Sequence, residues 1–210
     1  MDLSKTIKNL EKNNMRVITA DNRTQALQEL KKLLPLGGTV THGGSMTLAE
    51  VGVPELLKNG DYQYLDRTAV PDPREVYIKG YDADVFLTSA NAVTENGELY
   101  NVDGNCNRIS AISFGPKKVI VLVGKNKIVP TLEDAVIRVK RIAAPKNGVR
   151  LGCNTYCAKF GKCVSLSKEN STMTDGCASA DRMCRNYLIS GPQRDPGRVT
   201  VILINEDLGY

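Results

Sequence analysis

Five of the six cysteines in this 210-residue chain lie in its last third, and thiols are suited to metal and redox chemistry. Four of them follow the spacing Cys-x5-Cys-x13-Cys-x6-Cys: Cys157, Cys163, Cys177 and Cys184. We expect these four thiolates to converge on one site that holds either a tetrahedral zinc ion or an iron–sulfur cluster. Free or reversibly oxidised thiols are the alternative. No Cys-x2-Cys pair occurs, and the 13 residues between Cys163 and Cys177 are not a specific metal-ligand spacing.

The residues around these cysteines favour a metal site over a packed core. Between residues 165 and 176 only Leu166 and Met173 are sizeable apolar side chains. Burial alone would therefore struggle to offset the entropy lost when this stretch becomes ordered. Metal binding can supply the missing stabilisation, because a structural zinc site contributes on the order of 10 kcal/mol in small modules.

A second candidate is the glycine pair that follows a short β-favouring run at residues 39–41 and precedes a helix start. Free backbone N–H groups at such a turn attract phosphates and carboxylates, and glycine lets a ligand approach the backbone closely. The expected anion-binding residues here are Gly43, Gly44, Ser45 and Thr47. The alternative is a plain strand–helix turn in which the serine caps the helix.

The third candidate is a polar segment that follows a predicted hairpin turn at residues 96–97, an Asn-Gly pair. We expect Arg108 to hold an anion through its two terminal nitrogens, and Glu95 to act as a base or nucleophile. The other expected ligand-binding residues are Asn101, Asp103 and Asn107. Open α/β sheets bind ligands at strand ends, so this segment should meet the glycine turn in one cleft. The alternative is that its polar side chains are exposed turn residues that bind no ligand.

Composition limits the function further. A single histidine, His42, excludes two-histidine metal sites and leaves little room for a serine–histidine mechanism. The net charge of +5 is concentrated in residues 111–150, which carry 9 basic and 2 acidic side chains. These lysines are dispersed without interleaved aromatic residues, so we expect no nucleic-acid partner. No apolar run approaches the roughly 18 residues of a membrane helix, and the polar N-terminus lacks a signal core, so we expect a cytoplasmic protein.

The periodicity predicts one α/β domain over residues 1–210, with a largely parallel sheet. The expected helices span residues 3–13, 23–34, 47–51 and 131–143, and the expected strands span residues 15–20, 39–41, 85–88, 118–123 and 198–205. Residues 151–196 break this pattern and are predicted to form an irregular cysteine-rich excursion before the last strand.

Four segments together resemble the LUD domain, the lactate-utilisation family: residues 43–52 (GGSMTLAEVG), 92–97 (AVTENG), 103–108 (DGNCNR) and 119–129 (VIVLVGKNKIV). The resemblance implies a three-layer α/β sandwich like that of the NagB/RpiA/CoA-transferase group. It also implies a link to the oxidation of lactate by an iron–sulfur complex, with other lactate-utilisation subunits as partners. This chain lacks the ferredoxin-like Cys-x2-Cys-x2-Cys-x3-Cys-Pro run of the family's long subunit and carries its own cysteine set instead.

Three functions therefore compete. The leading one is a LUD protein of lactate or organic-acid utilisation, a redox component that binds a small organic acid or phosphate-bearing ligand and a thiolate-ligated metal or iron–sulfur centre. The second is an acyl- or CoA-transferase, or a sugar-phosphate enzyme, of the same fold group. Residues 94–97 (Thr-Glu-Asn-Gly) are similar to the Ser-Glu-Asn-Gly segment with the nucleophilic glutamate of CoA-transferases. The third is a non-catalytic metal-binding or assembly protein; a homo-oligomer is compatible with each of them.

Overall fold

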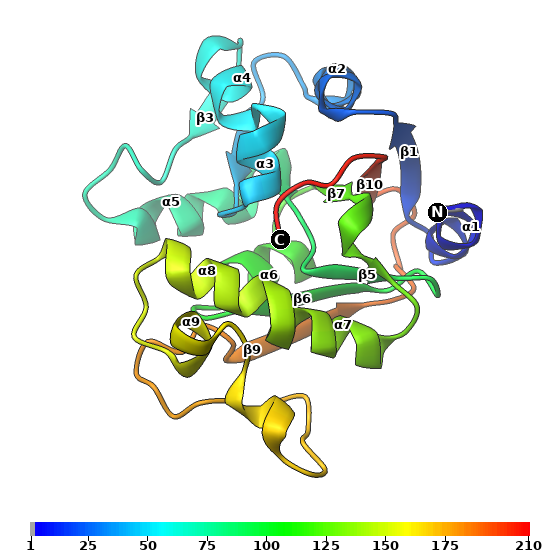
Figure 1. Cartoon of the computed structure of the whole chain (residues 1–210). Coiled ribbons are helices and arrows are strands. Elements are labelled where there is room, and N and C mark those ends of the chain that lie inside the picture. The colour runs from blue at the N-terminus through cyan, green and yellow to red at the C-terminus, as the bar shows by residue number, and fades with distance from the viewer. Residues whose placement is uncertain (1–2) are drawn as a thin grey trace.

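A six-stranded sheet, parallel throughout, runs through the computed structural model, which describes residues 3–210 (Figure 1). Its strand order is β1-β10-β7-β4-β2-β3. The strands are β1 (Arg16–Ala20), β2 (Thr39–His42), β3 (Gln63–Leu65), β4 (Val85–Thr88), β7 (Lys118–Gly124) and β10 (Val199–Ile204). The predicted α/β class with a largely parallel sheet is confirmed. Met1 and Asp2, from the polar N-terminal stretch, lie outside the described residues.

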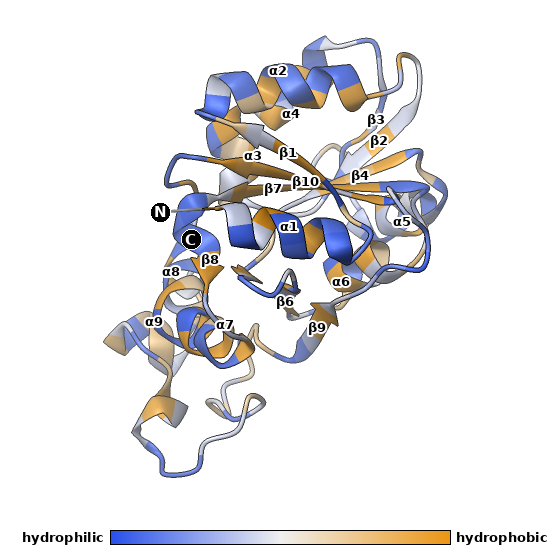
Figure 2. Cartoon of the chain, turned by 90° about the vertical axis from the view of Figure 1, so that its right-hand side faces the viewer, coloured by the Kyte–Doolittle hydropathy of each residue, from blue (hydrophilic) through white to orange (hydrophobic). Residues whose placement is uncertain are grey.

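Helices cover both faces of this sheet because the central strands are apolar on both sides (Figure 2). One face packs against α2 (Arg23–Leu33), α3 (Met46–Val51) and α4 (Val53–Asn59). The other face packs against α1 (Ser4–Lys12) and α6 (Asn107–Ser113). Alternate residues of β7 pack into the two cores. Ile120 and Leu122 face the core under α2, α3 and α4, and the other core contains Val119, Val121 and Val123. A further helix, α5 (Pro73–Lys79), precedes β4.

A second sheet of four short strands, which the sequence predicts only in part, lies below the first. Its order is β8-β5-β6-β9, formed by β8 (Ile128–Val129), β5 (Ala92–Thr94), β6 (Leu99–Asp103) and β9 (Asn186–Ser190). The predicted hairpin is confirmed, since β5 and β6 pair antiparallel around Gly97. That glycine has φ of +83°, and a Cβ there would lie 2.5 Å from the backbone of Asn9. The turn therefore requires glycine.

One long helix crosses the small sheet on its outer side (Figure 1). It begins with α7 (Leu132–Arg138), passes through a π-helical turn (Val139–Ala143) and continues as α8 (Ala144–Arg150). Thr131 caps its start by accepting a hydrogen bond from the Asp134 amide at 3.2 Å. The wider turn lies directly before Pro145, which has no amide proton to donate back into the helix. The helix thus extends seven residues beyond its predicted end.

Most of the cysteine-rich stretch forms loops below this helix. It contains α9 (Tyr156–Phe160) and a 3-10 turn (Val164–Ser167) before β9 joins the edge of the small sheet. Of the helices in residues 3–210, none is both long and apolar enough to cross a membrane.

Candidate functional site

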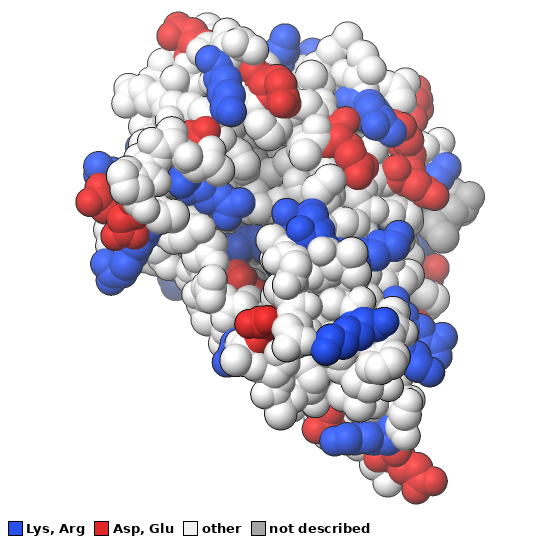
Figure 3. Space-filling model, turned by 60° about the vertical axis from the view of Figure 1, so that its left-hand side comes forward, with Lys and Arg blue, Asp and Glu red and all other residues white. Residues whose placement is uncertain are grey.

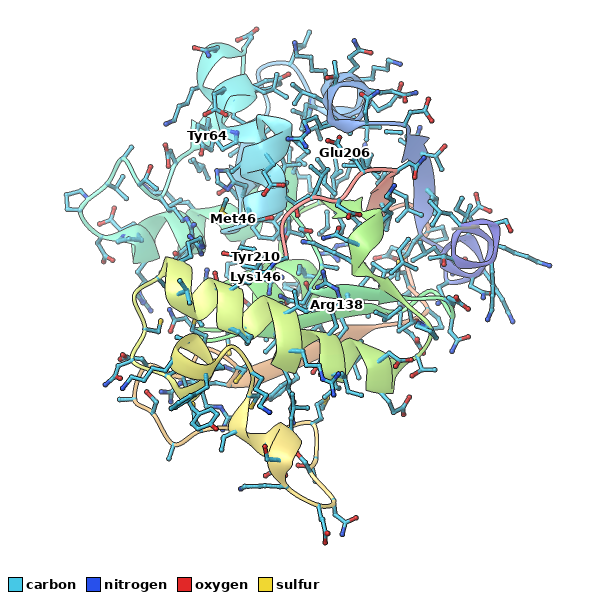
Figure 4. All side chains as sticks on the ribbon, in the orientation of Figure 1. Met46, Tyr64, Arg138, Lys146, Glu206 and Tyr210 are labelled. Atoms are coloured by element: carbon cyan, nitrogen blue, oxygen red, sulfur yellow. The ribbon has the colours of Figure 1, made fainter. Side chains whose placement is uncertain are left out.

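The glycine turn and the polar segment meet, as predicted, at an open cleft of about 600 Å³. Five of the predicted anion-binding residues line this cleft: Gly44, Ser45, Asp103, Asn107 and Arg108. Met46 and Tyr210 line it as well and lie between α3 and the long helix (Figure 4). The cleft therefore lies between the carboxyl ends of the main strands and the small sheet with its covering helix.

The two glycines of the turn leave room for two arginines. A Cβ at Gly43 would lie 3.0 Å from Cδ of Arg108, and a Cβ at Gly44 would lie 2.8 Å from Nη2 of Arg67. Any larger residue would push these side chains away from the turn. The two glycines thus let the side chains of Arg108 and Arg67 approach the backbone of the turn, and they also leave that backbone accessible.

Ser45 and Thr47 have structural roles at the start of α3. The Ser45 hydroxyl accepts a hydrogen bond from the Leu48 amide at 3.3 Å, which is the N-cap bond of the alternative interpretation. Thr47 is fully buried behind the cleft wall and donates to the Leu208 carbonyl at 3.2 Å. Ser45 caps α3 and also lines the cleft, whereas Thr47 does not line the cleft.

Arg108 differs from the expected anion clamp. Its Nη1 donates to Ser89 O (3.2 Å) and Asn101 Oδ1 (2.6 Å), and its Nη2 donates to Asn91 Oδ1 (3.0 Å) and Val102 O (2.7 Å). All four terminal N–H groups are therefore engaged by neutral acceptors, which leaves no free pair for bidentate binding. Burial lowers the pKa of Arg108, and Asp103 partly opposes the shift. Arg108 supplies fixed positive charge and positions the wall.

Two of the predicted polar residues support Arg108 and its helix. Asp103 accepts hydrogen bonds from the backbone amides of Arg108 (2.9 Å) and Ile109 (3.2 Å), at the start of α6. Asn101 is buried behind the cleft, and its Nδ2 has no hydrogen-bond partner among the described residues. Asp103 thus holds the start of α6, and Asn101 holds the guanidinium of Arg108. Both residues position Arg108 at the cleft.

The structure adds five cations that the sequence analysis missed: Arg67, Lys127, Arg150, Arg182 and Arg185. With Arg108, six basic side chains line the cleft, against two acidic ones, Asp103 and Asp181. In the described part of the chain, none of the six has a carboxylate within ion-pair distance. Lys and Arg side chains border the hollow in Figure 3. These cations come from distant segments, so no local pattern could have indicated them.

Glu95 does not line the cleft. Its carboxylate pairs with Lys5 Nζ at 2.8 Å, and the two side chains are 38% and 62% exposed. It lies at the hairpin turn, where the Asn9 side chain donates to its carbonyl at 2.7 Å. The structure thus brings Glu95 to α1, where its carboxylate is paired with Lys5 outside the cleft.

All four predicted cysteines line a second, much smaller cavity of about 20 Å³. Apolar and aromatic side chains complete most of its wall: Tyr100, Val136, Val139, Met173 and Tyr187. Val139, Ala144 and Cys184 line both this thiol cavity and the cleft. The two cavities therefore share part of their wall, and Cys184 belongs to both linings.

The two buried thiols of the cavity are reduced and hydrogen-bonded. Cys157 Sγ lies 3.4 Å from the Thr155 hydroxyl, and Cys163 Sγ lies 3.3 Å from the Ser165 hydroxyl. Burial raises the pKa of the Cys157 thiol, and the hydrogen bond from the Thr155 hydroxyl partly opposes this shift. The four thiols share the lining of one cavity.

Two cations stand beside these thiols. Arg182 donates to the carbonyls of Cys184 (2.9 Å) and Cys177 (3.4 Å), and Lys140 donates to the Thr172 carbonyl at 2.7 Å. Across residues 3–210, no three His, Cys, Asp or Glu side chains lie close enough together to hold a single metal ion. The other two cysteines, Cys106 and Cys153, line neither cavity.

Comparison with known proteins agrees with this fold. The family model for the LUD domain matches residues 3–204. The crystal structure of a DUF162 family protein from Deinococcus radiodurans superposes with a TM-score of 0.53 at 16% identity, covering 97% of this chain and 96% of that one. The delta subunit of eIF2B from Chaetomium thermophilum gives a TM-score of 0.35 at 18% identity, covering 60% of this chain and 50% of that one. No curated protein sequence matches this chain significantly. The chain belongs to the LUD domain family.

Proposed function

We propose that this LUD protein is a redox component of organic-acid utilisation, which holds a small organic anion beside an iron–sulfur centre. One observation carries the proposal: an open cationic cleft and a cavity with four thiols share the wall formed by Val139, Ala144 and Cys184. A ligand in the cleft and a centre on the thiols would thus lie one side-chain layer apart.

The charges of the cleft support an anionic ligand. Within residues 3–210 the five arginines of the cleft have no carboxylate partners, so they leave a positive potential, which a cleft with low-dielectric walls focuses. Arg67 is the cation best placed to bind the ligand, because among residues 3–210 its guanidinium donates to one group alone, the Tyr77 hydroxyl at 3.3 Å. A volume of about 600 Å³ lies in the range of small-molecule sites. Lactate, pyruvate and related acids fit this charge and size.

All-thiolate ligation suits zinc or an iron–sulfur cluster, and the resemblance to lactate-utilisation proteins favours the cluster. Zinc–sulfur bonds of about 2.3 Å would place tetrahedral ligand sulfurs about 3.8 Å apart. Within residues 3–210 no three His, Cys, Asp or Glu side chains lie close enough together to hold a metal ion, so either centre requires the thiols to move. The cavity of about 20 Å³ has room for one water-sized body. Residues 164–184, which contain no helix or strand apart from a 3-10 turn, would therefore move outward on loading.

Cys157, Cys163, Cys177 and Cys184 would hold the centre, which would supply electron transfer when bound. Lys140 and Arg182 would balance the charge of the four thiolates. The apolar wall around the thiols keeps water away, and this exclusion tunes the potential of such centres.

The transferase alternative depends on Glu95, and its ion pair with Lys5 places that carboxylate outside the cleft. A non-catalytic metal-binding protein would need the thiol cavity alone and would give no reason for six unpaired cations next to it. Both observations favour the redox component.

The test of the thiol half is to purify the protein without oxygen and measure iron, sulfide and zinc alongside the visible absorption spectrum. We expect iron and sulfide in similar amounts and a brown colour. Cys177→Ser and Cys184→Ser should lose the iron, whereas Cys106→Ser, which changes a thiol outside both cavities, should retain it. Zinc alone would make the site structural, and protein with no metal would contradict the proposal.

The test of the cleft half is calorimetric titration with lactate and pyruvate. Arg67→Ala should weaken binding about tenfold, since a charged hydrogen bond contributes roughly 1.4 kcal/mol or more. Lys58→Ala is the matched control, because Lys58 also carries a charge near Asp66 (3.9 Å) but does not line the cleft. Equal losses of binding affinity in the two variants would show that the net charge of the protein, and not a contact with Arg67, determines binding.

A further inference from the structure

Lys127 is a buried amine on the wall of the cleft. It ends the 3-10 turn between β7 and β8 and is only 3% exposed. Its Nζ donates to Thr47 Oγ1 at 2.7 Å and to Ser89 Oγ at 3.1 Å. Gly209 covers it from the other side, since a Cβ there would lie 3.3 Å from Nζ. The side chain is thus held in place.

The charges around Lys127 disfavour its protonated form. Arg108 from α6 and Arg138 from α7 add positive potential, and no carboxylate within residues 3–210 forms an ion pair with the amine. Glu50 from α3 acts in the opposite direction, but its carboxylate already accepts a hydrogen bond from the Gly209 amide at 2.8 Å. Burial, followed by the two arginines, lowers the pKa of Lys127 to about 7. A large share of the molecules therefore carry a neutral amine at neutral pH.

The hydrogen bonds leave this amine a free position. Thr47 gives its own proton to the Leu208 carbonyl, so it accepts from Lys127. Two N–H groups donated to two hydroxyls leave the nitrogen of a neutral lysine with its lone pair, and Lys127 lines the cleft. A desolvated lysine beside other cations is an established way to activate an amine nucleophile.

We infer that Lys127 captures the carbonyl carbon of a 2-oxo acid bound in the cleft and forms a Schiff base with it. The inference rests on the acid-binding half of the proposed function and is independent of the thiol half. A 2-oxo acid has a carboxylate next to a carbonyl group, and the cleft has unpaired cations next to an amine. The carboxylate would bind the cations while the carbonyl meets Nζ.

The step balances without an oxidant or reductant. The lone pair of Nζ forms a bond to the carbonyl carbon, the carbon–oxygen double bond becomes a carbon–nitrogen double bond, and the oxygen leaves as water with the two amine protons. Ser89 is placed to pass these protons, because its hydroxyl makes only long contacts of 3.4 Å as a donor, to Thr47 Oγ1 and the Ala90 carbonyl.

The test is to incubate the wild-type protein with pyruvate and cyanoborohydride at pH 7, which reduces an imine to a stable amine. Peptide mass mapping should then locate the adduct on Lys127. At pH 7 an amine with a pKa of about 7 is half neutral. An ordinary lysine with a pKa of about 10.4 is neutral in roughly one molecule in 2,500. We therefore expect Lys127 to be labelled at least about 100-fold more than Lys125, the partly exposed lysine on the same turn.

Three controls sharpen the result. Lys127→Arg keeps the charge and should abolish the adduct, whereas Lys125→Arg should leave it unchanged. Lactate, which has no carbonyl at the second carbon, should give no adduct. Acetone, which has a carbonyl but no carboxylate, should label Lys127 far more weakly than pyruvate does, because the cations would not bind it.

Calorimetry separates the two proposals. Pyruvate that binds in the cleft without labelling Lys127 would overturn the Schiff base and leave the proposed acid site intact. Equal labelling of Lys125 and Lys127 would also overturn it. Mapping is done on the wild-type protein, so a folding defect in Lys127→Arg cannot hide the answer. Pyruvate that neither binds nor labels would count against the acid-binding half as well.

Discussion

The cleft and the thiol cavity share a wall yet are built in opposite ways. The cleft is open, about 600 Å³ in volume, and lined by six cations without carboxylate partners. The thiol cavity has about 20 Å³, and apolar side chains and four free cysteines line it. The main strands, the small sheet and the long helix frame the cleft, whereas loops carry most of the thiols.

The two sites differ in the interactions that hold their residues in place. Arg108 makes four hydrogen bonds, two to β6 and two to the short link between β4 and β5, so the cleft is formed before any ligand arrives. The loop around Cys177 has little apolar side-chain area to bury, and Arg182 ties it together through carbonyl groups. The cleft is therefore preorganised, and the thiol cavity depends on what it binds.

The largest effect should come from removing the iron–sulfur centre that we propose for the thiol cavity. Metal–thiolate binding contributes on the order of 10 kcal/mol in small modules. Stripping iron with a chelator should speed amide hydrogen exchange in residues 153–184 at least about 100-fold, while β7 and β10 keep their protection. Hydrogen-exchange mass spectrometry checks this. Unchanged exchange would mean that the loop is ordered without metal and that the two regions do not differ in this way.

Replacing Arg108 tests the preorganised side. Arg108→Met should lower the free energy of unfolding by about 3 kcal/mol, because four buried acceptors lose their donor. Binding of pyruvate should be lost with it, whereas iron content should remain that of the wild type. Denaturant unfolding and iron analysis give the two readouts. A loss of iron equal to the loss of pyruvate binding would show that the wall couples the two sites.

The pH dependence of stability tests the buried amine. The pKa of Lys127 is lowered to about 7 in the folded protein, so between that value and about 10.4 the unfolded chain binds more protons. Stability from this group is therefore gained as pH rises through that window and lost as pH falls toward 7. Wild type should gain about 2 kcal/mol over Lys127→Met between pH 7.5 and 9. A constant difference would mean that the amine is not desolvated.

The smallest effect should come from Glu95, which lies outside both cavities. Glu95→Gln removes one exposed ion pair, so the free energy of unfolding should change by no more than about 0.5 kcal/mol. Pyruvate binding and iron content should stay at their wild-type values. A strong loss of pyruvate binding would restore the catalytic role that its sequence neighbours suggest.

Sequence pattern was most informative where an element is long and its core face continuous. The stripe of apolar residues predicts α2 closely, and the Asn22 side chain caps it by accepting from the Gln25 amide at 3.0 Å. The run in β7 likewise has the composition of a strand buried on both faces. By contrast α4, α5 and β3 were missed. The two helices are short and bounded by glycine or proline, and β3 has only three residues.

The sequence by itself determined the family, the parallel sheet, the hairpin at Gly97 and the meeting of the glycine turn with the Arg108 segment, because each depends on local pattern and chain direction. Only the tertiary structure decided what each side chain does there. Lys127 and Glu95 have hydrogen-bond partners that lie 80 and 90 positions away in the chain, and neutral acceptors occupy Arg108. Burial and charge are sums over neighbours in space, and those neighbours are set by the packing of segments far apart in the chain.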